Sequence, residues 1–107
     1  MIEIVTGDDE LIPITLKKNG LTFSISSLAT VKIAIIDKAH TAILCGPFTL
    51  SHTEAGSDWP NSLIIGKIPG LSSKSLTAQL AGLEIEVNDG GKKTWFVDAK
   101  LVKGLIQ

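Results

Sequence analysis

The sequence has few of the residues on which several protein classes depend. Among its 107 residues there are one cysteine, no arginine and no tyrosine, and the aromatic side chains amount to two tryptophans and three phenylalanines. A single cysteine, Cys45, excludes an internal disulfide framework. Nucleic-acid binding relies on clustered positive charge and on bidentate guanidinium contacts, so a chain of net charge −1 without arginine is not expected to bind nucleic acid.

Long apolar runs are also missing. No stretch approaches the roughly 18 apolar residues of a membrane span, so we expect no membrane partner. The first residues, MIEIVTGDDE, lack the basic start and apolar run of a signal peptide. We therefore expect a chain made in the cytoplasm and not secreted by a signal peptide.

The composition that remains is that of a folded domain. Hydrophobic residues make up 44% of the chain and charged residues 20%, which is enough apolar surface to offset the entropy of ordering. Chains of about this length form one domain in most cases. We expect residues 1–107 to fold as a single domain.

The dominant hydrophobic period is two, which is typical of β-strands. It is clear in LEIEVND (83–89) and in TVKIAIID (30–37), where apolar residues on both faces predict a strand covered on both sides. LIPITLKK (11–18) alternates in the same way. Pro13 cannot donate to a strand ladder, which predicts an edge or a bulge there.

Turn-forming residues separate these runs. The strongest hairpin signal is Asn19-Gly20, and a second lies at 88–91. Only residues 73–83, with Leu76 and Leu80 four apart behind serine caps, offer a short helix. About seven short strands with frequent turns predict an all-β chain, an antiparallel sandwich or a small barrel.

Three consecutive acids, Asp8, Asp9 and Glu10, raise the question of a metal site. Calcium usually needs six to eight oxygen ligands, and the chain turns apolar directly after Glu10. We expect these acids to form a polar corner that leads into a strand. No metal or cofactor is expected.

Cys45, His40 and His52 are the other candidates for chemistry, as a nucleophile with its base or as zinc ligands. Their spacings match neither arrangement. We expect exposed histidines and a buried cysteine.

Two short motifs resemble catalytic loops but lack essential residues. GGKKT (90–94) has Glu86 where a phosphate loop needs its first glycine, and Lys93 where that loop needs a hydroxyl residue. GLSSK (70–74) has Lys74 where a nucleophile elbow needs its closing glycine. Neither predicts a catalytic or phosphate site.

Trp59 lies in a polar stretch, HTEAGSDWPNS (52–62), between two expected strands. An aromatic side chain in such a loop can stack on a sugar or anchor a protein interface. It can equally fold back over an open end of the sandwich. Trp95, in the strand-like run TWFVDAKL, is expected to pack in the core or at an edge.

The N-terminal third resembles a known family. A GDD corner at Gly7 and Asp8, a strand at 12–16, the Asn19-Gly20 turn, a short segment at 25–28 and a core strand at 31–36 follow one another in that order. This pattern resembles the immunoglobulin-like module at the N-terminus of tailed-phage upper baseplate proteins and related phage tail-associated proteins. LEIEVNDGGKKTWF resembles its closing hairpin, whereas residues 42–80 match no part of it.

The resemblance implies an immunoglobulin-like antiparallel β-sandwich of about seven strands without enzymatic activity. It implies a structural or assembly module of a phage or prophage tail or baseplate, whose partners are identical subunits or other virion proteins. For the contact surface we select Asp58, Trp59 and Pro60 in the long loop, together with the strand that carries Pro13.

Two other functions are open at this point. The chain could be a small carbohydrate-binding module with Trp59 as its stacking platform, although such modules usually carry several aromatics. It could also be a small hydrolase that uses Cys45 or the acids, in which case Cys45→Ala or Asp8→Asn would abolish activity.

Overall fold

The computed structural model describes residues 1–26, 28–50, 59 and 63–104. In this part of the chain nine strands and one helical turn follow one another, which confirms the all-β prediction. The elements are β1 (Ile2–Thr6), β2 (Glu10–Thr15), β3 (Lys17–Lys18), β4 (Leu21–Thr22), β5 (Thr30–Asp37), β6 (Ile43–Leu50), β7 (Leu63–Ile68), α1 (Gly70–Ser73), β8 (Gln79–Asn88) and β9 (Lys92–Lys103).

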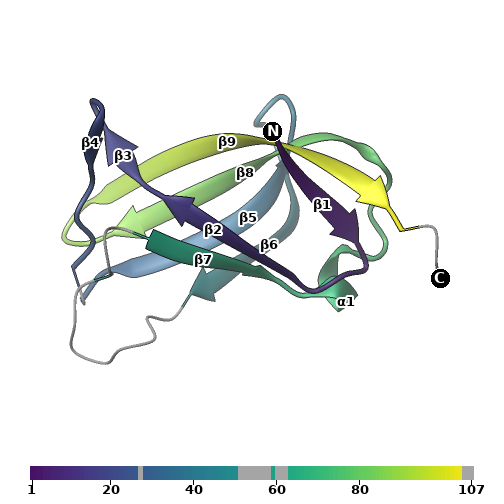
Figure 1. Ribbon diagram of the computed structural model, residues 1–107, viewed down its shortest axis with the longest axis horizontal. Coiled ribbons are helices and arrows are strands. Elements are labelled where there is room, and N and C mark those ends of the chain that lie inside the picture. Colours follow the sequence, from purple (N-terminus) through teal and green to yellow (C-terminus); the bar gives the residue numbers. More distant parts are fainter. Residues whose placement is uncertain (27, 51–58, 60–62, 105–107) are drawn as a thin grey trace.

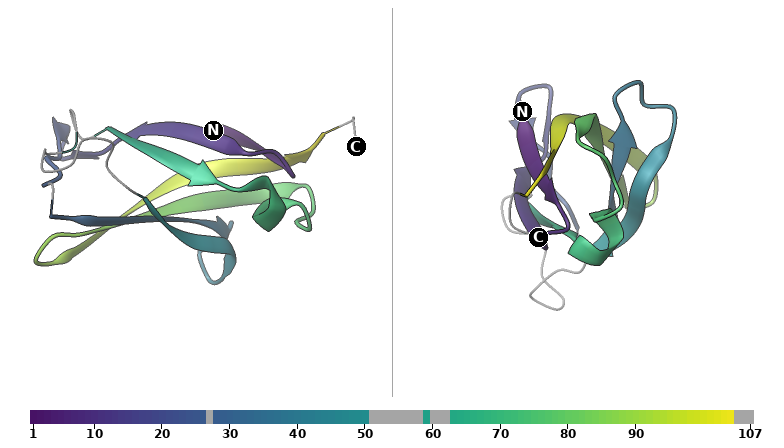
Figure 2. Two further views of the ribbon diagram at one scale, coloured as in Figure 1. Left: turned by 90° about the horizontal axis from the view of Figure 1, so that it is seen from below. Right: turned by 90° about the vertical axis from the view of Figure 1, so that its right-hand side faces the viewer.

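The strands form a large sheet and two small ones. The large sheet has the order β1-β9-β8-β5-β6, and β2 pairs with β7 in a two-stranded sheet that lies across it (Figures 1 and 2). The β3–β4 hairpin is the third sheet. Neighbouring strands are antiparallel with one exception, because β1 runs parallel to β9. The expectation of a wholly antiparallel arrangement is therefore wrong at β1.

The core lies between the large sheet and the β2–β7 pair. Val31, Ile33 and Ile35 of β5 are buried at alternate positions, as the period of two predicts. Opposite them, β7 lies so close that a Cβ atom on Gly66 would stand 2.7 Å from the Cδ1 atom of Ile33. The missing side chain of Gly66 thus allows the two layers to pack closely.

The second face of β5 is covered as well. Ala34 and Ile36 point away from the core but are also buried. Beside Ile36 lies His40 of the connection between β5 and β6: a Cβ atom on Gly82 of β8 would stand 3.3 Å from the Ile36 Cγ1 atom and 3.6 Å from the His40 Nε2 atom. The prediction that this strand is covered on both sides is confirmed.

Both predicted hairpins are present. Asn19 and Gly20 have φ angles of 54° and 78°, the left-handed values that a two-residue type I′ turn requires. They join β3 to β4, with Lys17 opposite Thr22. The second hairpin joins β8 to β9, with Asn88 opposite Lys92.

The predicted helix over 73–83 is wrong. The helical turn α1 covers only Gly70–Ser73, and β8 begins at Gln79. Ala81, Leu83, Ile85 and Val87 are buried at a period of two, whereas Leu80 is exposed. β8 pairs along its length with both β5 and β9. The burial of alternate side chains between these strands favours a strand more than two leucines four residues apart favour a helix.

The β5–β6 connection is held by one carboxylate. Asp37 accepts hydrogen bonds from the backbone N–H groups of Thr41, at 2.7 Å, and Ala42, at 3.0 Å, and from the Thr41 hydroxyl. The Thr41 hydroxyl bond and then the Ala42 bond hold the pKa of Asp37 below its ordinary value of 3.8. The charged form of Asp37 therefore stabilises the turn.

We expect Asp37→Asn to lower the unfolding temperature, and the effect should depend on pH. A carboxyl whose pKa is lower in the folded state stabilises the fold above its ordinary pKa, and the stabilisation is lost as the pH falls through the lowered value. The difference between wild type and variant should thus be full at neutral pH and shrink as the pH falls below 3.8. Thermal melts across this range would measure it, and a pH-independent difference would contradict the role of the charge.

Candidate functional site

Two of the three consecutive acids, Asp9 and Glu10, hold a corner of the backbone. The Asp9 Oδ1 atom accepts the N–H of Gly70 at 2.8 Å, and the Glu10 Oε1 atom accepts the N–H of Val5 at 3.0 Å. Ser73 in turn accepts the N–H of Gly7 through its Oγ atom at 3.0 Å. The corner leads directly into β2, so the prediction of a strand-leading corner is confirmed.

These bonds also give the acids their local role. Asp9 and Glu10 each satisfy a backbone donor that a sharp corner would otherwise leave without a protein partner. Within residues 1–26, 28–50, 59 and 63–104, no three histidine, cysteine or acidic side chains gather closely enough to hold a metal ion.

Cys45 and His40 are not brought together. Cys45 is buried in the core beneath α1, where its Sγ atom lies 3.4 Å from the carbonyl oxygen of Ser72. Burial raises the pKa of the Cys45 thiol, which favours the unreactive neutral form. His40 is exposed and stacks on Phe96 with ring centroids 4.5 Å apart. The exposed histidine and buried cysteine match the prediction, and His52 lies outside the described residues.

Trp59 packs into the core. Its exposed fraction is 7%, and its backbone N–H donates to the carbonyl oxygen of Ile25 at 3.0 Å. The sequence left open whether Trp59 is exposed as a contact residue or folds back onto the strands. In the structure it folds back. Trp59, selected from the sequence for the contact surface, is thus buried and not exposed, because a large indole gains more from burial in the core than from water. Asp58 and Pro60 lie outside the described residues.

Trp95 is half-buried and packs at an edge, as predicted. Its ring meets that of Phe23 edge-on, with centroids 4.9 Å apart, and its indole N–H donates to the carbonyl oxygen of Lys17 at 2.9 Å. Local sequence patterns do not predict the hydrogen bond to Lys17, because the two residues are 78 positions apart. Through Trp95 the β3–β4 hairpin is fastened to β9.

Pro13 lies on an outward-facing apolar patch. It stands opposite Ile65 in the β2–β7 pair, and Leu11 and Leu63 lie on the same outer side. The exposed fractions of Leu11, Leu63 and Ile65 are 64%, 39% and 37%. We call Leu11, Pro13, Leu63 and Ile65 the outer apolar face. Sequence analysis selected Pro13 but did not place it beside β7. The outward side chains of β7, Leu63, Ile65 and Lys67, alternate with the buried positions 64, 66 and 68.

Comparison with known proteins identifies no relative. No protein-family model matches the chain, and neither a curated protein nor a solved structure is significantly similar to it. In the described part of the chain, no helix is long and apolar enough to cross a membrane.

Proposed function

We propose that the chain is a non-enzymatic assembly module of a phage or prophage tail or baseplate, built as an immunoglobulin-like sandwich. The outer apolar face is its contact surface, and its partners are identical copies or a neighbouring virion protein. The observation that carries the proposal is this face, which presents four apolar side chains to solvent on one small sheet.

The strand order supports the immunoglobulin-like part of the proposal. In immunoglobulin domains strands C, F and G lie in one sheet, variable domains add C′ to it, and strands B and E belong to the other. Here β5, β8 and β9 correspond to C, F and G, β6 lies beside β5 as C′ does, and β2 pairs with β7 as B and E do. The chain order of these six strands is the same in both.

The composition of the outer apolar face supports a protein contact. The outer side of an antiparallel sheet that only faces water is usually polar. On β2 and β7 the outer side carries leucine, proline and isoleucine, while Thr15 and Lys67 stand at its ends. An apolar centre with a polar rim is the usual composition of a protein–protein interface.

The test is to place charge on this face. We expect the double variant Leu11→Lys, Ile65→Lys to remain folded, because both side chains are exposed and the buried Ile12 and Ile64 beside them are unchanged. Its self-association, or its capture by a tail partner, should fall at least tenfold, because two lysines would have to be desolvated in the contact. Sedimentation velocity measures the association, and circular dichroism the fold.

Leu71→Lys is the matched control. Leu71 lies on α1, outside the outer apolar face, and its exposed fraction is 81%. This variant should associate as the wild type does. Equal loss of association in both variants would mean that the face is not the contact.

A further inference from the structure

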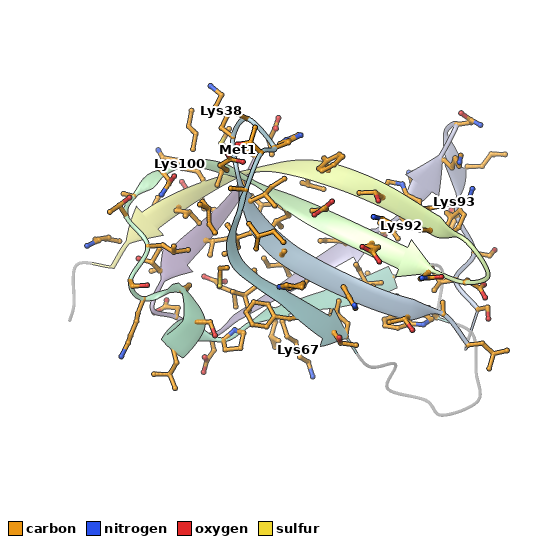
Figure 3. The ribbon with its side chains drawn as sticks, turned by 180° about the vertical axis from the view of Figure 1, so that it is seen from behind. Met1, Lys38, Lys67, Lys92, Lys93 and Lys100 are labelled. Atoms are coloured by element: carbon orange, nitrogen blue, oxygen red, sulfur yellow. The ribbon has the colours of Figure 1, made fainter. Side chains whose placement is uncertain are left out.

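Two lysine pairs that lie far apart in the sequence meet at one end of the fold. Lys17 and Lys18 precede the Asn19-Gly20 turn, and Lys92 and Lys93 begin β9 after the second hairpin. Figure 3 shows Lys92 and Lys93 at one end of the large sheet, and the β3–β4 hairpin lies beside this end. Four of the ten lysines thus gather on two adjoining hairpins.

Contacts of two aromatic side chains, Trp95 and Phe23, hold the two hairpins in position relative to each other. The Trp95 indole holds the Lys17 carbonyl, and the backbone N–H of Phe23 donates to the carbonyl oxygen of Leu16 at 2.9 Å. The Lys93 Nζ atom lies 5.9 Å from the centroid of the Phe23 ring, within the range of a cation–π contact. The backbone of Lys18 is therefore held beside Lys93.

The charges at this end are not balanced. Lys92 is paired with Glu86, with 3.8 Å between Nζ and Oε2. Within the described residues, Lys17, Lys18 and Lys93 form no ion pair. The pKa of Lys18 is lowered, first by its direct side-chain contact with Lys93 and then by repulsion from that ammonium. Lys18 on the β3–β4 hairpin and Lys93 over the Phe23 ring thus lie at the same end of the fold, and among the described residues neither is paired with a carboxylate.

We propose that Lys18 and Lys93 form a binding site for one tetrahedral oxoanion, a phosphate or a sulfate, either free or as a monoester group on a larger molecule. Such an ion accepts hydrogen bonds from both ammonium groups at once and removes their repulsion. Lys17 on the same hairpin adds long-range attraction. The site suits a single anionic group, because a nucleic-acid strand requires a longer series of phosphate contacts. It is separate from the outer apolar face and independent of the assembly proposal.

The experiment is an NMR titration of the full chain with inorganic phosphate, inorganic sulfate and glycerol phosphate, with chloride keeping the ionic strength constant. We expect saturable shifts of the Trp95 indole N–H and of the Lys18 and Lys93 amides. Lys18→Gln and Lys93→Gln should each weaken binding at least fivefold, and the double variant should abolish it. Both side chains are exposed, so the folded spectrum should persist in the variants.

Lys100→Gln is the charge-matched control and should bind as the wild type does. Lys100 lies on the same strand but far from Lys93 (Figure 3). Tighter binding of glycerol phosphate than of inorganic phosphate would identify the ligand as a group carried by a larger molecule, whereas equal or weaker binding would identify the free anion, and both support the site. Shifts that fail to saturate, or that persist unchanged in Lys18→Gln, would overturn it.

Discussion

Gly70→Ala should destabilise the protein by about 3 kcal/mol, the upper part of the range for overpacking a tight site. A Cβ atom at this position would stand 2.3 Å from the carbonyl oxygen of Gly7 and 2.9 Å from the carbonyl carbon of Asp8. These are backbone atoms, so no side-chain rotation relieves the clash. The corner would have to move away from α1, and the bond from the Gly70 N–H to Asp9 would be lost with it.

Urea unfolding measured by circular dichroism would test this expectation. Gly91→Ala is the control, because a Cβ atom on Gly91 meets no atom within 4 Å and its φ is not in the left-handed range. That variant should lie within about 0.5 kcal/mol of the wild type, as is usual for surface substitutions. Equal stability of the two variants would show that the corner does not pack closely on α1.

Trp59→Ala should also be strongly destabilising, by about 3–5 kcal/mol, the usual cost of truncating a buried tryptophan. The side chain belongs to the core cluster that includes Ile25 and Ile64. Its removal would leave a cavity in the core, and the surrounding strands can collapse only in part. The measurement is again the free energy of unfolding.

Leu28→Ala serves as the comparison, because Leu28 is exposed and its truncation should change stability little. Comparing Trp59→Ala with the double variant of the outer apolar face separates effects on packing from effects on assembly. Trp59→Ala should lower stability, whereas Leu11→Lys, Ile65→Lys should lower association. If Trp59→Ala abolished association and left stability unchanged, the tryptophan would be a contact residue after all.

Local patterns predicted the parts of the fold that depend on neighbouring residues. The alternation in β5 gave its bounds as residues 30–37, and Asn19-Gly20 gave the hairpin, because strand faces and tight turns follow from a few adjacent side chains. The corner at Asp8–Glu10 was also predicted. Its bonds to α1 were not, because Asp9 and Gly70 are 61 residues apart.

The candidate surfaces depend on such long-range contacts and were harder to predict. Pro13 was correctly placed on a strand, but its neighbour Ile65 belongs to β7, and only strand pairing brings the two together. The sequence left open whether Trp59 is exposed or packed, because a polar stretch around an indole does not reveal whether the ring points inward. The meeting of Lys18 and Lys93 likewise depends on how two hairpins pack.

The most direct test of the proposed function is sedimentation velocity of three proteins over a range of concentrations. They are the wild type, the double variant that carries both Leu11→Lys and Ile65→Lys, and the control variant Leu71→Lys. If the outer apolar face joins identical copies, the sedimentation coefficients of wild type and Leu71→Lys will rise with concentration, while that of the double variant will stay at the monomer value. A wild type that remains a monomer throughout and captures no virion protein, or a double variant that associates as the wild type does, would contradict the proposed function.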